Sequence, residues 1–263
     1  MEKVAIVTGG SSGIGKAVAE SLAHAGLRVY EFSRRDRQPE GITHIGVDVT
    51  DEDAVLQAVS GICETEGRID ILVNCAGFGI SGTVEFTAES EARRQLDVNF
   101  FGIVNCTKAI LPVMRRQQQG RIVCVSSVAG PIPIPFQAYY SVSKAAINAY
   151  VMALANEIRP YGISVCAVQP GDIASGFTDA RAKSFEGDQE YGGRIFRSVA
   201  VMEKDERTGM KPEAAGAYIA RIALKNSVKP LYAIGFIYKA FCVIMKLLPC
   251  RFSNYLIGLI YAK

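Results

Sequence analysis

Short continuous apolar runs alternate along the chain with longer stretches in which apolar residues recur every three or four positions. The apolar runs predict strands at residues 4–8, 28–32, 43–47, 69–74, 121–126 and 163–168, with a further one near 229–233. Helical spacing predicts helices at residues 14–25, 51–66, 89–116, 138–159 and 211–224. Because the strands are apolar throughout rather than in alternation, we expect them to be buried on both faces.

This alternation of strands and helices predicts an α/β fold. Right-handed connections between strands give a parallel sheet with helices on both faces, so we expect a single-domain, Rossmann-type, doubly wound sheet of about seven strands. The length of 263 residues fits one such domain. We assign the domain to residues 1–230 and expect residues 231–263 to form an apolar helical extension packed on it.

Two segments depart from the alternation. Residues 172–210 are polar and lack periodicity, and a loop of that length in a compact domain is usually functional or mobile. The extension is strongly apolar, but its longest uncharged run, Pro230–Tyr238, is far shorter than a membrane span. Two helices separated at Pro249 fit its pattern, and they suit either packing over the core or contact with a membrane surface. Packing is the expectation.

Composition and charge exclude several classes of function. The net charge of +3 is too small, and too dispersed, to indicate a nucleic-acid partner. Only two histidines occur, His24 and His44, and neither has a partner at metal-ligand spacing, so we expect no metal. The seven cysteines form no C-x-x-C pair, which favours a reducing, cytoplasmic location. The apolar run at residue 4 leaves no room for a signal peptide.

The first predicted strand ends in a glycine-rich turn that opens directly into a helix. Glycine lets a backbone approach a pyrophosphate closely, and the helix N-terminus offers free N–H groups to its oxygens. The alternative is a plain Gly/Ser turn, but the strand before it and the helix after it favour a dinucleotide site. The residues of the turn are Gly9, Gly10, Ser11, Ser12, Gly13, Ile14 and Gly15.

This turn resembles the cofactor motif of the short-chain dehydrogenase/reductase family, and we see a likeness to its hydroxysteroid and retinol dehydrogenase-like branch. Further family marks follow in order over residues 3–224. Asp48-Val49 resembles the pair that contacts adenine, and Asn99 matches an asparagine of the family's central helix. Asn74-Cys75-Ala76-Gly77 resembles the family's Asn-Asn-Ala-Gly turn, with Cys75 in place of the second asparagine. The resemblance implies that residues 1–230 bind a dinucleotide and carry the catalytic groups.

The end of the second predicted strand indicates which nicotinamide cofactor is bound. An acidic residue there would bind the ribose hydroxyls and repel a 2′-phosphate, but Ser33 stands in its place. Arg34 and Arg35 follow, and guanidinium groups suit bidentate recognition of a phosphate. A solvated basic loop is the alternative. The position favours NADP(H).

The candidate reacting groups lie on the helix predicted at 138–159 and the strand before it. Tyr140 and Lys144 are four residues apart, so they share a helix face, and a nearby ammonium would lower the pKa of a tyrosine. Ser127, thirteen residues before Tyr140, matches the family's catalytic serine, with Ser126 as the alternative. The resemblance implies that Tyr140 exchanges the proton, that Lys144 also holds the nicotinamide ribose, and that Asn99 belongs to a proton relay.

A last family match lies after the strand predicted at 163–168. In the family this stretch lines the nicotinamide, and a serine here keeps the hydroxyl of the usual threonine. The matching residues are Pro170, Gly171, Asp172, Ile173, Ala174 and Ser175.

The sequence thus predicts an NADP(H)-dependent oxidoreductase that interconverts a ketone or aldehyde and the corresponding alcohol. The apolar extension and three aromatic residues, Phe177, Phe185 and Tyr191, favour a hydrophobic, steroid- or retinoid-like substrate. Two alternatives stay open: a 3-oxoacyl thioester reductase and a non-catalytic NADP(H) sensor. We expect a homodimer or homotetramer, with peripheral membrane contact through the extension as the less favoured outcome.

Overall fold

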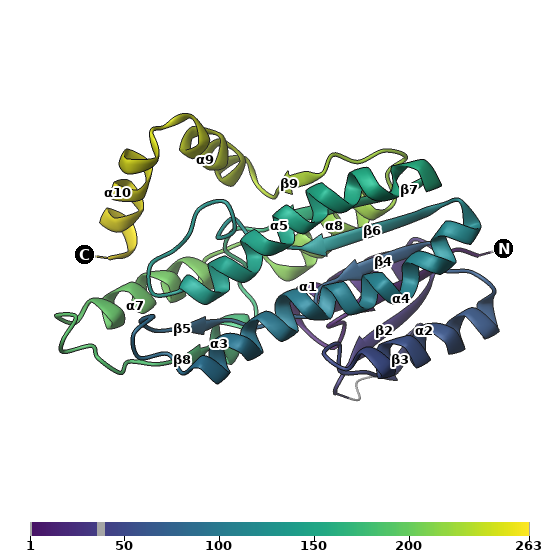
Figure 1. The fold of residues 1–263 in the computed structure, drawn as a ribbon, viewed down its shortest axis with the longest axis horizontal. Coiled ribbons are helices and arrows are strands. Elements are labelled where there is room, and N and C mark those ends of the chain that lie inside the picture. The colour runs from purple at the N-terminus through teal and green to yellow at the C-terminus, as the bar shows by residue number, and fades with distance from the viewer. Residues whose placement is uncertain (1, 36–39, 263) are drawn as a thin grey trace.

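The computed structural model describes residues 2–35 and 40–262, and its centre is a seven-stranded parallel sheet (Figure 1). The predicted doubly wound α/β fold is confirmed. In spatial order the strands are β3 (Ile42–Gly46), β2 (Arg28–Ser33), β1 (Val4–Thr8), β4 (Ile71–Asn74), β6 (Gly120–Val125), β7 (Ile163–Gln169) and β9 (Leu231–Ala233). The order reverses between β1 and β4, where such sheets open a crevice at their carboxyl edge.

Helices cover both faces of the sheet, as the apolar strands predict. Successive residues of β1 enter different cores: Ile6 packs on one face and Val7 on the other. One face is covered by α2 (Glu52–Glu66), α4 (Gly102–Gln117) and α5 (Ala138–Ile158), and the other by α1 (Gly13–His24) and α8 (Pro212–Ala223). A short 3-10 turn, η2 (Arg159–Tyr161), joins α5 to β7.

The long helix predicted at 89–116 is present, with a π-helical turn inside it. It runs as α3 (Glu89–Leu96), the π segment η1 (Asp97–Phe101) and α4. The whole stretch is long and apolar enough to cross a membrane by composition. Its apolar side chains, among them Ile110 and Met114, are buried against the sheet, so we interpret it as a core helix. The π turn widens the helix at Asn99, a candidate site residue.

The prediction that residues 172–210 form an unstructured loop is wrong. The segment contains α6 (Phe177–Ala180), β8 (Ala182–Lys183) and α7 (Arg194–Arg207), and β8 pairs with β5 (Ile80–Ser81). The large buried apolar side chains of helix α7 form one stripe, Ile195, Val199 and Met202, whereas Phe196 of the same helix is exposed. A stripe of three residues is too weak a periodic signal to read from sequence, because tertiary packing stabilises the helix.

The extension folds as two helices, as its pattern predicts. These are α9 (Phe236–Leu247) and α10 (Cys250–Tyr261), separated at Pro249, and Lys263 lies outside the described residues. Figure 1 shows them as an arch at one end of the sheet, with α10 returning toward α7. The buried Cys242 and Ile257 pack with Ile132 in a small apolar cluster.

A close helix contact tests this packing. A Cβ added at Gly216 of α8 would lie 2.5 Å from the Cβ of Ala17 and 2.6 Å from its carbonyl carbon, so Gly216→Ala must push α1 and α8 apart. We expect a loss of about 1–3 kcal/mol in unfolding free energy, measured by urea denaturation.

The matched control is Gly61→Ala in α2, where nothing lies within 4 Å of the added Cβ. It should leave stability unchanged or raise it by up to about 1 kcal/mol, because alanine is the better helix former. Equal effects of the two substitutions would contradict the observed contact between α1 and α8.

Candidate active site

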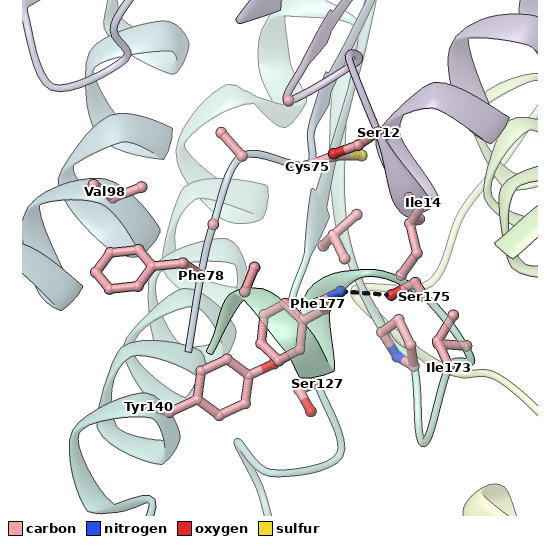
Figure 2. Close-up of a pocket in the computed structure, with 18 of the residues that line it drawn as sticks. Ser12, Ile14, Cys75, Phe78, Val98, Ser127, Tyr140, Ile173, Ser175 and Phe177 are labelled. Atoms are coloured by element: carbon pink, nitrogen blue, oxygen red, sulfur yellow. Dashed lines mark hydrogen bonds between the residues drawn. The ribbon is translucent and has the colours of Figure 1, made fainter. Parts of the chain in front are cut away.

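A cavity of about 590 Å³ opens at the carboxyl edge of the sheet, where the segments following β1, β2, β4, β6 and β7 meet. Figure 2 shows Ser12 and Cys75 toward one end of it and Tyr140 and Ser127 toward the other. Most of the residues predicted from sequence line its wall. They are Gly9, Ser11, Ser12, Gly13, Ile14, Gly15, Ser33, Arg34, Arg35, Asp48, Val49, Ala76, Gly77, Ser127, Tyr140, Lys144, Pro170, Gly171, Ile173 and Ser175.

Two predicted residues, Asn74 and Asn99, lie behind the wall. Asn74 is the last residue of β4, is buried, and donates from Nδ2 to the Sγ of Cys124 at 3.7 Å. Asn99 lies in η1, accepts from the backbone N–H of Phe78 at 3.0 Å and donates to the carbonyl oxygen of the same residue at 2.9 Å. A second donated bond, to the Ser143 hydroxyl at 3.2 Å, ties this loop to α5. Both asparagines therefore position the wall and do not form it.

The glycine-rich turn fits a pyrophosphate. Gly9 has a φ of +68°, which favours glycine, and a Cβ added at Gly15 would lie 2.2 Å from the carbonyl oxygen of Gly9. Helix α1 begins after Ser12, whose side chain makes no capping hydrogen bond within the part of the chain that the structure describes. The first residues of α1, Gly13, Ile14 and Gly15, line the cavity, so the helix N-terminus is placed there as an anion site requires.

Thr8, the residue directly before the glycine-rich turn and the first of the Thr-Gly-x-x-x-Gly-Ile-Gly motif, joins two turns at this edge. Its Oγ1 accepts hydrogen bonds from the backbone N–H groups of Cys75 and Ala76, each at 3.0 Å. The turn after β4 is thereby held against the turn after β1. A Cβ added at Gly9 would lie 2.9 Å from the backbone of Ala76, so the two turns are in direct contact.

A basic corner lies at the far end of the cavity. Arg34 has a side chain that is 66% exposed, and its guanidinium lies 3.8 Å from the Asp48 carboxylate. Ser33 donates its hydroxyl to the carbonyl oxygen of Arg35 at 3.0 Å, which shapes the turn after β2. Sequence reasoning missed Arg94 of α3, which also lines the cavity. These guanidinium groups give the corner a positive charge suited to a phosphate.

An acidic residue near this corner is hidden from the cavity. Glu31 of β2 is fully buried and pairs with His44, and its carboxylate lies 3.2 Å from the Ser33 hydroxyl oxygen, as a second acceptor for the one hydroxyl proton. A Cβ added at Gly10 would lie 2.6 Å from the Glu31 side chain, so the carboxylate lies beneath the glycine-rich turn. Of the described residues, the two directly after β2 that are exposed, Arg34 and Arg35, are both basic.

Lys144 is buried beside Tyr140 on α5. Its Nζ donates to the carbonyl oxygen of Val125, the last residue of β6, at 2.9 Å and lies 5.6 Å from the centre of the Tyr140 ring. The ring of Phe177, from α6, lies beside that of Tyr140, with 5.8 Å between ring centres (Figure 2). The expected pairing of Tyr140 and Lys144 on one helix face is present.

The two candidate serines differ in what their hydroxyls bind. Ser126 donates to the backbone carbonyl oxygen of Lys144 at 3.0 Å and so fastens α5 to the end of β6. Ser127 lies beside Tyr140 in the cavity (Figure 2), and its Oγ accepts from the N–H of Ala129 at 3.1 Å. Spacing favoured Ser127, and its contact with the Tyr140 side chain supports the same choice.

The pKa values of Tyr140 and Lys144 are shifted in opposite directions. Burial raises the pKa of Tyr140 to about 12, against the lowering effect of its hydrogen bond with Ser127 and of the charge on Arg181. Burial lowers the pKa of Lys144 to about 8. The prediction that Lys144 lowers the pKa of Tyr140 is wrong for the protein in this state, because desolvation of the phenol outweighs the nearby charges.

The remaining wall comes from segments that no motif marks. Phe177 of α6, Met202 and Glu206 of α7, and Tyr261 of α10 all line the cavity beyond Tyr140. Of the three aromatic residues predicted to favour an apolar substrate, only Phe177 is in this wall. Phe185 packs on Phe196, and Tyr191 packs on Phe136.

Comparisons with known proteins agree with this geometry. The sequence profile of the family described as short chain dehydrogenase matches residues 3–186. The chain is 39% identical to a protein named 3-ketodihydrosphingosine reductase from Bacteroides thetaiotaomicron, over 99% of this chain and 98% of the relative. A short-chain dehydrogenase from Streptomyces avermitilis has a similar structure, with a TM-score of 0.82, 31% identity, and coverage of 92% of this chain and 91% of that one. A structure of ElxO with NADP bound gives a TM-score of 0.76 at 25% identity, covering 91% of this chain and all 100% of ElxO.

The pKa of Lys144 gives a testable pH dependence. Below pH 8 the amine is protonated in both folded and unfolded chains, and burial of the charge destabilises the fold. From pH 8 to its ordinary value of 10.5, only the unfolded chain keeps the proton, so this destabilisation is relieved as pH rises. The stability of Lys144→Met relative to wild type should therefore fall by about 3 kcal/mol between pH 7 and pH 10.5.

Urea denaturation of both proteins across this range measures the difference, in which the other titrating groups cancel. If the stability of Lys144→Met relative to wild type stayed constant or rose with pH, the burial of a charged Lys144 would be contradicted.

Proposed function

The chain belongs to the short-chain dehydrogenase family, and on that basis we propose that it is an NADP(H)-dependent reductase that interconverts a ketone and a secondary alcohol on an apolar substrate. The observation that carries the proposal is the meeting of Tyr140, Ser127 and Lys144 at one end of a cavity whose other end is a glycine-rich turn. The turn suits the pyrophosphate, and the three side chains suit the reacting carbonyl.

Each of the three side chains has a separate task. When bound, the nicotinamide supplies or accepts the hydride. The Tyr140 hydroxyl donates a proton to the carbonyl oxygen during reduction and takes it back during oxidation. Ser127 donates a hydrogen bond to the same oxygen as negative charge develops there. The Lys144 ammonium holds the nicotinamide ribose and stabilises the phenolate left on Tyr140.

The protonation states of Tyr140 and Lys144 before the cofactor binds are consistent with these tasks. A phenol with a pKa of about 12 keeps its proton at neutral pH, as a general acid must before reduction. Lys144, with a pKa of about 8, is mostly protonated at pH 7. Reduction therefore starts with both protons in place, and transfer from Tyr140 leaves an anion beside a cation.

The preference for NADP(H) rests on the basic corner. Arg34 and Arg35 follow β2 where a carboxylate would bind the ribose hydroxyls of NAD, and Glu31 is buried away from that surface. The similarity to a structure with NADP bound supports the same cofactor. Arg94 adds a third guanidinium to the wall.

The substrate proposed is a long-chain ketone carrying an amino group, rather than the steroid or retinoid that the sequence favours. The name of the relative from Bacteroides thetaiotaomicron supports this class. So does the wall beyond Tyr140, which combines apolar Phe177, Met202 and Tyr261 with two carboxylates, Asp172 and Glu206. Both carboxylates have partners within the fold, since Glu206 pairs with Arg181 and Asp172 accepts from the Tyr238 hydroxyl. The apolar part of the wall therefore supports the long chain, and the name of the relative supports the amino group.

The location proposed is the cytoplasm. All seven cysteines are free thiols, and burial raises the pKa of Cys75, Cys106 and Cys124 to about 12 in each case, which keeps them protonated. Free thiols are typical of a reducing compartment.

Removing one hydroxyl tests the proton donor. Tyr140→Phe keeps the ring against Phe177 and removes the acid, so kcat for ketone reduction should fall at least ~10²-fold. NADPH binding, measured by fluorescence, should change little. Tyr139→Phe is the matched control, because Tyr139 is the adjacent tyrosine and does not line the cavity. Near wild-type turnover by Tyr140→Phe would rule out the proposed mechanism.

The cofactor preference is tested at Arg34. Arg34→Ala should weaken NADPH binding by roughly 1.5–3 kcal/mol, the contribution of a hydrogen bond to a charged group, and leave NADH almost unaffected. Arg93→Ala is the control, because Arg93 pairs with Glu89 on α3 and lies outside the cavity wall. Equal losses for both cofactors would show that Arg34 does not contact a 2′-phosphate.

A further inference from the structure

The two helices of the extension each bury one side and expose large apolar side chains on another. On α9 the exposed side chains include Phe236, Val243 and Leu247, which follow one stripe of the helix at spacings of seven and four residues. Phe236 is 86% exposed and Leu247 80% exposed. We call the exposed large apolar side chains of both helices the apolar face. They are Phe236, Ile237, Val243, Ile244, Leu247, Phe252, Tyr255, Leu259 and Ile260.

Both helices of the extension are packed on the rest of the fold. The opposite sides of both helices are packed: Cys242 of α9 and Ile257 of α10 are buried, and Tyr261 packs against the buried stripe of α7. A helix that is apolar on its packed side and also on its outer side requires a second apolar environment. The apolar face is therefore an interaction surface.

The charges beside the apolar face identify what covers it. Residues 230–263 contain no Asp or Glu, and the exposed Lys239, Lys246 and Arg251 lie among the apolar residues. If two copies of the chain paired through this face, two-fold symmetry would bring the cations of one copy near the cations of the other. The extension has no carboxylate to neutralise that repulsion. Anionic headgroups above an acyl layer complement both the charge and the apolar side chains.

We propose that α9 and α10 form a docking surface for an anionic phospholipid bilayer, with the apolar face inserted below the headgroups and Lys246 and Arg251 among them. The helices lie along the surface, since each has only 12 residues and neither is long enough to span a membrane. The extension therefore both packs on the core and contacts the membrane.

The same two helices are fastened to the cavity wall. Tyr238 of α9 donates its hydroxyl to the carboxylate of Asp172, and its oxygen accepts from the Asp172 N–H at 3.2 Å. Its ring covers Gly171, where an added Cβ would lie 2.3 Å away. Tyr261 of α10 is itself part of the wall. A bilayer on the apolar face would lie next to the substrate end of the cavity.

The test uses the full chain and vesicles, without any measurement of turnover, so its outcome is independent of the proposed reaction. Wild-type protein should sediment with vesicles that mix phosphatidylcholine and phosphatidylglycerol, and much less with phosphatidylcholine alone. Phe236→Ser with Leu247→Ser should lower the partition coefficient at least about 10-fold. Lys246→Gln with Arg251→Gln should lower it roughly 10- to 30-fold on the mixed vesicles only.

The control is Val84→Ser with Phe196→Ser, because both residues are exposed and apolar but lie outside the extension. Thermal unfolding of each variant verifies that it is folded. The proposal is overturned if wild-type protein binds neither vesicle, or if the control variant loses binding as strongly as Phe236→Ser with Leu247→Ser. It is also overturned if sedimentation velocity shows that wild-type protein is a dimer and that Phe236→Ser with Leu247→Ser is a monomer, while vesicle binding is unchanged.

Discussion

The site depends on one buried charge, the ammonium of Lys144. It is 6% exposed, and within the described residues its hydrogen bond goes to the carbonyl oxygen of Val125 rather than to a carboxylate. A buried ammonium with a neutral partner is costly, which is why its pKa is lowered to about 8. That cost keeps the lysine in a position to gain from any negative charge formed nearby. A phenolate on Tyr140 is the charge that the proposed reaction creates, and the Lys144 ammonium is the nearby cation that would stabilise it.

The parallel sheet makes this arrangement possible. All the strands end at one edge, so the glycine-rich turn after β1, the basic corner after β2 and the serine after β6 lie around one cavity. Neutral groups hold these segments in register: Thr8 binds the turn after β4, Asn99 binds Phe78, and Ser126 binds the backbone of α5. These bonds between neutral groups hold the segments that carry the charged and reactive side chains.

The central strands and most helices could be predicted because their signals are local. Continuous apolar runs mark β1 and β6, and the spacing of Tyr140 and Lys144 places both on one helix face. The helix α7 could not be predicted, because its buried stripe is short and depends on residues far away in sequence. For the same reason the sequence did not select Arg94, Glu206 or Tyr261, since only the folded chain brings them to the cavity. The pKa of Tyr140 was predicted with the wrong sign, because spacing reveals a neighbouring charge and not the extent of burial.

The central claim is that NADPH reduces a carbonyl in this cavity. The most direct measurement uses NADPH carrying deuterium on one face of the nicotinamide C4 and a long-chain 3-keto amino alcohol presented in vesicles, with the product analysed by mass spectrometry. Two cofactors are compared, one labelled on each face of the nicotinamide. We predict one deuterium per product molecule, at the carbinol carbon, with one labelled cofactor and none with the other. Transfer of deuterium from both faces of the nicotinamide, or consumption of NADPH with no labelled alcohol from either labelled cofactor, would contradict this claim.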